Sequence, residues 1–164
     1  MRLRVIFSVA AALLFASLSF QVTQAGAPDA RSLRVGGEAQ TAAAAGASKS
    51  IWDGVFSEAQ AKRGEEAYKT HCSECHGGDL MGDGFAPSLA GADFQGNWND
   101  LSVGDLFERV RISMPPSGPS SVPPAAKADI LAHIFNMNKY PTGETELEPK
   151  TEALKTIKIE LKKP

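Results

Sequence analysis

The chain gathers its thiol and imidazole side chains in one short segment, residues 71–76 (HCSECH). This segment holds both cysteines of the sequence and two of its three histidines. Residues of these types at this spacing could form a redox-active dithiol, a metal site or the attachment point of a larger group. The segments before and after it decide which of the three the sequence favours.

Cys72, Cys75 and His76 match C-x-x-C-H, the attachment signature of c-type haem. Two cysteines three positions apart on a helical turn face the same way, which suits two thioether bonds to neighbouring vinyl groups of one porphyrin. The histidine that follows the second cysteine can then bind the iron. We therefore predict one covalent haem c, attached through Cys72 and Cys75 and ligated by His76.

Three other interpretations of the motif remain open. A thioredoxin-like dithiol belongs near a βαβ pattern, and no strand pattern precedes Cys72. A zinc site could use His71, Cys72, Cys75 and His76, but adjacent residues rarely point into one tetrahedron, and zinc sites usually draw a second ligand pair from a distance. A simple disulfide would close a tiny loop and stabilise the fold little.

A haem iron needs a second axial ligand or leaves an open position, and Met114 is the best candidate for that ligand. It ends a predicted helix, and Pro115 forces it into an extended conformation from which its thioether can reach inward. His133 is the main rival, although it lies in the middle of a predicted helix. Met81 follows His76 too closely, and Met137 fits a core position.

The elements that must position these residues are helical. Ser57 and Gln60 form a capping-box pattern at the start of a first helix. Ser102 caps a second helix, and Pro124 begins a third that runs to about Met137. Residues 77–99 are rich in glycine and predict a long irregular loop. We expect a small all-α domain with three main helices, whose limited core calls for a bound group.

The ends of the chain carry other signals. Residues 1–25 combine a basic start, an apolar run and a small-residue cleavage site, the pattern of a secretory signal peptide. Residues 26–50 predict a flexible linker, 51–141 the domain and 142–164 a C-terminal extension with a weak strand-like alternation. We therefore expect a periplasmic protein, which would associate with a membrane only if the signal is retained as an anchor.

The charge distribution limits the partners. The formal net charge is −2, and residues 51–140 hold twelve acidic and seven basic side chains. Nucleic-acid binding would need a basic stripe on the folded part, so we do not expect it. An acidic surface instead predicts transient, salt-sensitive docking to other proteins.

Four segments together resemble a known family: CSECHG at 72–77, APSLAG at 86–91, SMPP at 113–116 and ADILAHIF at 128–135. They resemble the class I c-type cytochromes with a single haem. Over about residues 51–141 the chain is similar to the cytochrome c proteins and domains that accompany quinoprotein (PQQ) alcohol dehydrogenases. The resemblance implies a small class I cytochrome c fold, with Gly- and Pro-rich loops wrapped around one covalently bound haem.

The resemblance also implies roles for single residues. The Pro87 carbonyl would accept a hydrogen bond from Nδ1 of His76, and Trp98 would lie near a haem propionate. Gly64 and Tyr68 would form the crossing between the first and the third predicted helix. His133 occupies a position where such proteins often carry tyrosine. A histidine at this position could have a pH-sensitive role.

The function implied is one-electron transfer, since a neutral imidazole and a thioether would saturate the iron. Electrons would come from a periplasmic dehydrogenase and pass to an oxidase or another cytochrome, and the chain would not be an enzyme. Two alternatives remain: a haem enzyme or gas sensor in which Met114 is displaceable, and a thiol oxidoreductase without haem.

Overall fold

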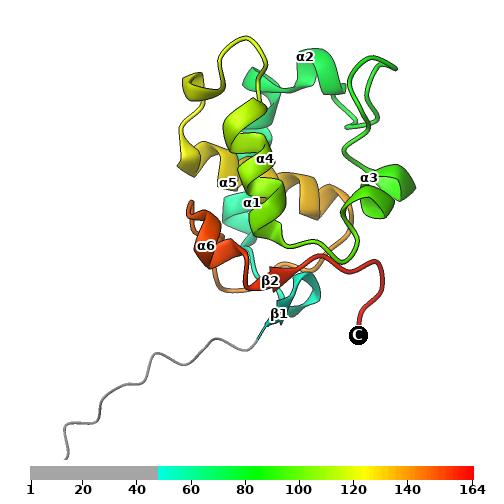
Figure 1. Ribbon diagram of the computed structural model, residues 1–164, viewed down its shortest axis with the longest axis vertical. Coiled ribbons are helices and arrows are strands. Elements are labelled where there is room, and N and C mark those ends of the chain that lie inside the picture. Colours follow the sequence, from blue (N-terminus) through cyan, green and yellow to red (C-terminus); the bar gives the residue numbers. More distant parts are fainter. Residues whose placement is uncertain (1–47) are drawn as a thin grey trace, which may run out of the picture. The chain divides into compact units, whose positions relative to one another are not determined.

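The computed structural model describes residues 48–164. The predicted signal peptide and most of the predicted linker fall in residues 1–47, outside the described residues. The elements follow one another along the chain (Figure 1): β1 (Lys49–Ser50), the 3-10 helix η1 (Ile51–Asp53), α1 (Glu58–His71), α2 (Ser73–His76), α3 (Gly91–Trp98), α4 (Val103–Ser113), the 3-10 helix η2 (Pro119–Ser121), α5 (Pro124–Met137), α6 (Thr151–Leu154) and β2 (Ile157–Lys158).

The two longest helices, α1 and α5, pack against each other and form the centre of the fold. At their contact, a Cβ added to Gly64 would lie 1.8 Å from the carbonyl oxygen of Asp129, so only glycine allows this approach. Tyr68 lies one turn further along α1 and is fully buried. The predicted crossing of the first and third helices is confirmed, as is the all-α fold class.

Serine residues cap the starts of α1 and α4. Ser57 accepts a hydrogen bond from the Gln60 N–H (3.0 Å) at the start of α1. The predicted capping box is nevertheless wrong, because the Gln60 side chain points elsewhere. Its amide group exchanges two hydrogen bonds with the main chain of Leu147 (2.8 and 3.0 Å), in the C-terminal extension. The buried side chain of Gln60 thus joins α1 to the C-terminal extension.

The glycine-rich segment 77–99 is not a loop throughout, because its second half forms α3. Two contacts hold this helix despite its weak intrinsic preference: Phe94 is buried in the core, and the Gly91 N–H donates to Oδ1 of Asn138 (3.0 Å) just after α5. Asn138 also donates to the Leu89 carbonyl (2.9 Å). Tertiary contacts therefore stabilise a helix that the local sequence does not predict.

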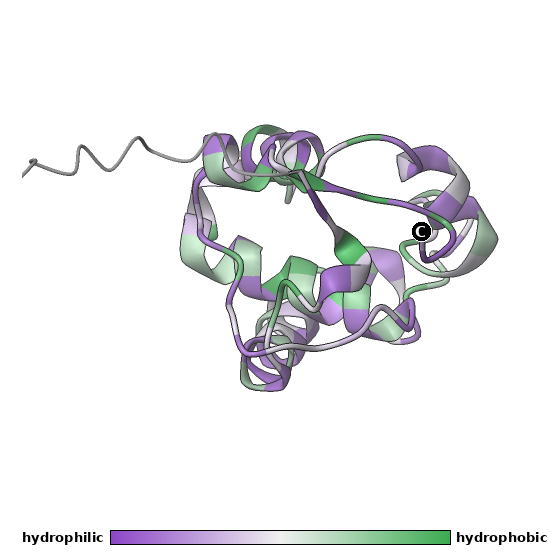
Figure 2. Cartoon of the chain, turned by 90° about the horizontal axis from the view of Figure 1, so that it is seen from below, coloured by the Kyte–Doolittle hydropathy of each residue, from purple (hydrophilic) through white to green (hydrophobic). Residues whose placement is uncertain are grey.

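The C-terminal extension folds back onto the helices. Leu154 and Ile159 are buried, and β2 pairs in parallel with β1, at the end of the predicted linker. Figure 2 shows helices of mixed hydropathy, as expected for helices that bury one face. Within residues 48–164, no helix combines the length and the apolar character that a membrane crossing requires.

Candidate haem-attachment site

The motif residues lie on a single helical turn that follows α1 directly. Cys72 ends α1 and begins α2, and its carbonyl accepts hydrogen bonds from the N–H groups of Cys75 (3.2 Å) and His76 (3.0 Å). Both cysteines are free thiols; Cys72 is half-buried and Cys75 is exposed. The turn therefore presents two thiols and one imidazole within five residues of the chain.

The imidazole of His76 is held by the loop that follows. Its Nδ1 lies 2.9 Å from the carbonyl oxygen of Pro87, which can only accept a hydrogen bond. Nδ1 must therefore carry a proton, and in the neutral ring the lone pair is then on Nε2. The structure thus brings together two of the residues singled out in the sequence, His76 and Pro87.

Two residues that sequence reasoning missed shape the loop that carries Pro87. Gly82 has a φ of +76°, donates its N–H to the His76 carbonyl (2.9 Å) and leaves no space for a Cβ, which would lie 2.4 Å from the Ala86 oxygen. The Asp83 carboxylate accepts hydrogen bonds from the N–H groups of Phe85 (2.9 Å) and Ala86 (2.7 Å), which lowers its pKa. An Asp-Gly pattern inside a glycine-rich segment was the available signal.

A tyrosine of α1 fixes the other end of this loop. The hydroxyl of Tyr68 donates a hydrogen bond of 2.8 Å to the carbonyl of Gly77, the residue after His76. Burial, with a smaller contribution from Cys72, raises the pKa of Tyr68 to about 12. The hydroxyl therefore remains a donor over the whole range in which an exposed tyrosine would begin to ionise.

The electrostatics of Cys72 are those of an unreactive thiol. Burial raises the pKa of the Cys72 thiol to about 11, although nearby Lys127 acts in the opposite direction. A redox-active dithiol depends on a thiolate with a lowered pKa. The environment of Cys72 therefore does not favour a nucleophilic cysteine.

Met114 occupies the position expected for a residue that leaves a helix. It follows α4 with φ −123° and ψ 137°, an extended conformation, and its N–H donates to the Val110 carbonyl (3.1 Å). The side chain is half-buried. Within residues 48–164, no hydrogen bond joins Met114 or the half-buried Trp98 to the turn that holds His76.

A buried lysine lies behind the Met114 segment, and sequence reasoning missed it. Lys127 is 2% exposed, and its ammonium donates hydrogen bonds to the carbonyls of Val110 (3.2 Å), Arg111 (3.0 Å) and Pro119 (2.7 Å). Burial lowers its pKa. A lysine among the alanines of α5 gave no sequence signal of burial, because lysine is almost never buried.

The remaining candidates are exposed or pack in the core. His133 is buried in the α1–α5 contact, with its ring centroid 5.3 Å from that of Tyr68, and burial lowers its pKa while Glu65 acts in the opposite direction. His71 and Met81 are exposed, and Met137 packs against the core. His133 therefore serves the crossing of the two long helices.

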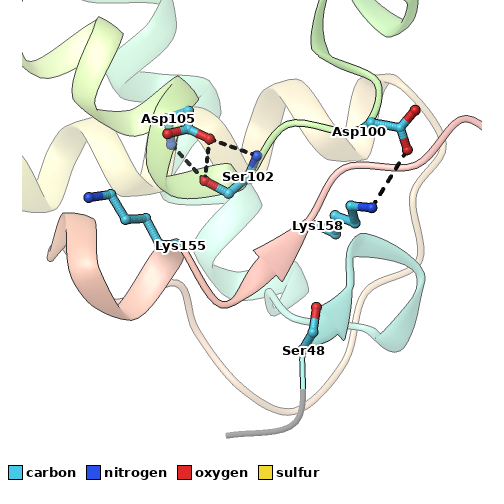
Figure 3. A pocket seen from close by; sticks show the side chains of 6 residues that line it. All are labelled: Ser48, Asp100, Ser102, Asp105, Lys155 and Lys158. Atoms are coloured by element: carbon cyan, nitrogen blue, oxygen red, sulfur yellow. Dashed lines mark hydrogen bonds and ion pairs between the residues drawn. The ribbon is translucent and has the colours of Figure 1, made fainter. Parts of the chain in front are cut away.

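A shallow hollow near the C-terminus offers no comparable chemistry. It lies between β1, β2, the start of α4 and the end of α6, and its walls are Ser48, Asp100, Ser102, Asp105, Lys155 and Lys158 (Figure 3). Its charged groups already have partners: Asp105 caps α4 through Ser102, and Asp100 faces Lys158 at 3.8 Å. In the part of the chain that the structure describes, no three His, Cys, Asp or Glu residues gather as a metal site.

Comparison with known proteins agrees with the geometry of the turn. Residues 59–134 match the family model described as "Cytochrome C oxidase, cbb3-type, subunit III". This segment runs from α1 to α5 and includes Cys72, Cys75, His76 and Met114. No curated protein and no solved structure matched the chain. The family match and the helical fold together support a c-type cytochrome domain over these residues, the kind of domain that binds haem and transfers electrons.

Proposed function

We propose that the chain is a periplasmic one-electron carrier with a single haem c. In this proposal Cys72 and Cys75 attach the haem, and His76 and Met114 are its axial ligands. The observation that carries the proposal is the hydrogen bond between Nδ1 of His76 and the Pro87 carbonyl, on the same turn that presents both thiols. This bond selects the tautomer in which Nε2 can bind iron and limits rotation of the ring.

The chemistry of the other side chains fits the same group. Met114 offers a soft thioether from an extended segment, and its half-buried side chain does not belong to the central cluster of buried residues. The half-buried Trp98, at the end of α3, is a candidate to contact a haem propionate. The unreactive environment of Cys72 favours attachment over dithiol exchange.

Haem c supplies a one-electron couple at its iron when it is bound. If His76 and Met114 both bind the iron, no coordination position is left for a substrate. A thioether ligand and burial away from water favour the reduced state, so we expect a raised potential. This arrangement suits a carrier better than an enzyme or a gas sensor.

The partners are redox proteins. We propose a periplasmic dehydrogenase as donor, of the quinoprotein class suggested by the sequence resemblance, and an oxidase or another cytochrome as acceptor. The description of the matched family, an oxidase subunit, supports the acceptor side. Because acidic side chains outnumber basic ones over residues 51–140, we expect docking to weaken as salt is added.

Optical spectra of the purified protein test the ligation. We expect a haem that stays with the chain after denaturation, a six-coordinate ferrous spectrum that carbon monoxide does not change, and the sulfur-to-iron charge-transfer band in the ferric state. Carbon monoxide binding to the ferrous protein at neutral pH would instead support a sensor or enzyme. A colourless protein with a reducible disulfide would support the thiol oxidoreductase.

A further inference from the structure

A buried ammonium group joins the two ends of the segment that presents Met114. The three acceptors of Lys127 lie on both sides of residues 114–118: Val110 and Arg111 belong to the last turn of α4, and Pro119 begins η2. A neutral amine has only two N–H donors, whereas an ammonium has three. The three hydrogen bonds therefore require the charged form of Lys127.

This ammonium has no carboxylate partner within residues 48–164. Its hydrogen bonds all go to main-chain carbonyls, and no ion pair involves it. A buried charge without a counter-ion is costly, so each of its donors needs an acceptor. The last carbonyls of α4 are suitable acceptors, since they lie at the negative end of the helix dipole and a carbonyl oxygen can accept a second hydrogen bond, as that of Val110 does here.

Within residues 48–164, the other hydrogen bonds of the segment are local. Met114 donates its N–H to Val110, and Gly118 donates its N–H to the Pro115 carbonyl (3.0 Å), which forms a local turn. Neither bond connects α4 to η2. The Lys127 ammonium makes this connection directly, from the buried face of α5.

We propose that Lys127 is a positioning residue for Met114: its ammonium clamps the end of α4 to η2 and thereby closes the segment that presents the methionine sulfur. The inference rests on the proposed His76/Met114 ligation. It goes beyond that ligation because it names the side chain, on a different helix, that holds the Met114 segment in place. Without the clamp, the methionine would leave the iron more often, and external ligands would bind more readily.

Imidazole titration of the ferric holoprotein tests the clamp. Methionine matches the length of the lysine stem without its donors, so Lys127→Met removes the clamp and retains the volume. We expect the affinity for imidazole to rise roughly tenfold. This change corresponds to the loss of about one charge-assisted hydrogen bond from the state in which Met114 binds the iron. Lys62→Met, on the exposed side of α1, removes the same charge and should leave the affinity unchanged.

The design separates positioning from general stability. A merely structural role would lower the melting temperature without changing the imidazole affinity measured far below it. If Lys127→Met does not accumulate as holoprotein, Lys127→Gln replaces it, since glutamine keeps two donors but cannot reach three acceptors. An imidazole affinity equal to that of the wild type in the folded variant would overturn the proposal.

A second measurement observes the Lys127 ammonium directly. Nitrogen-15 labelling of the lysines should reveal one ammonium whose protons exchange slowly with water, and Lys127→Met should remove that signal. Its absence from the wild type would overturn the clamp. A wild type without the sulfur-to-iron band would overturn the proposed ligation and the clamp together, whereas an intact band with unchanged imidazole affinity in the variant would overturn the clamp alone.

Discussion

The segment that carries His76 and the segment that carries Met114 are held in opposite ways. The loop after His76 is held by main-chain contacts, by the exposed carboxylate of Asp83 and by the hydroxyl of Tyr68. The segment after Met114 is held from inside, by the buried ammonium of Lys127. One side depends on many small local bonds and the other on a single buried group.

This difference suggests how each side responds to change. Several bonds hold the His76 loop, so losing one of them should loosen the loop without displacing His76. A single clamp between two elements has no substitute, so its loss should affect the whole Met114 segment. Both sides depend on the α1–α5 contact, since Tyr68 belongs to α1 and Lys127 to α5.

The largest effect is expected from a substitution that disturbs both the His76 segment and the Met114 segment. Gly64→Ala places a methyl group against the Asp129 carbonyl, at 1.8 Å in the present backbone, so α1 and α5 must separate. We expect the free energy of unfolding to fall by about 3 kcal/mol, the upper end for overpacking. Chemical denaturation of the holoprotein, followed by far-UV circular dichroism, measures this change.

Gly96→Ala is the matched control for this substitution. Gly96 lies in α3, where an added Cβ would meet no atom within 4 Å. The same change of residue should there stabilise the protein slightly, by up to about 1 kcal/mol, because alanine favours helices. Equal effects at both positions would contradict the close approach at Gly64.

The next largest effect concerns the Met114 side alone. Met114→Ala removes the proposed thioether ligand, and we expect the reduction potential to fall by on the order of 100 mV, equivalent to about 2.3 kcal/mol for one electron. Redox titration followed optically measures the shift. Met137→Ala serves as control, because Met137 packs against the core. A potential that falls equally in both variants would argue against Met114 as ligand.

The sequence predicts the three main helices and the His76 turn well because their signals are local. Ser57, Ser102 and Pro124 stand at helix starts whose geometry each residue determines by itself. C-x-x-C-H is likewise contained in one turn. The hydrogen bond from His76 to Pro87 was expected from the family resemblance alone, since nothing local to either residue indicates it.

The features that the sequence did not predict depend on residues distant along the chain. Gln60 pairs with Leu147, and α3 depends on Asn138. Lys127 is buried only because α4 and η2 offer it three carbonyls. In each case a polar side chain satisfies main-chain groups of another element, and such pairings leave no periodic pattern.

A smaller effect is expected from the bond that ties the His76 loop to α1. Tyr68→Phe removes the hydrogen bond to Gly77 (2.8 Å) and should reduce the free energy of unfolding by about 1 kcal/mol. The folded-state pKa of Tyr68 is raised, so its stabilising contribution is complete below pH 10 and is lost as the pH rises towards 12.

The pH dependence gives this prediction its control. Wild-type stability should decline between pH 10 and about 12 more steeply than that of Tyr68→Phe, which has no hydroxyl at this position to ionise. Unfolding curves recorded at several alkaline pH values compare the two proteins. Parallel declines in both would show that Tyr68 does not hold the loop in the way proposed.

The smallest effect should come from the exposed side of the His76 loop. Asp83→Asn weakens the hydrogen bonds from the Phe85 and Ala86 N–H groups, and we expect faster amide exchange at these two residues with an unchanged reduction potential. The pKa of Asp83 is lowered in the folded protein, so its contribution is present above its ordinary pKa and is lost as the pH falls through the folded-state value. In the wild type, acid should therefore increase exchange at the same two amides relative to neighbouring positions. A change in potential as large as that of Met114→Ala would contradict this prediction. It would mean that the Asp83 side chain alone determines the position of His76.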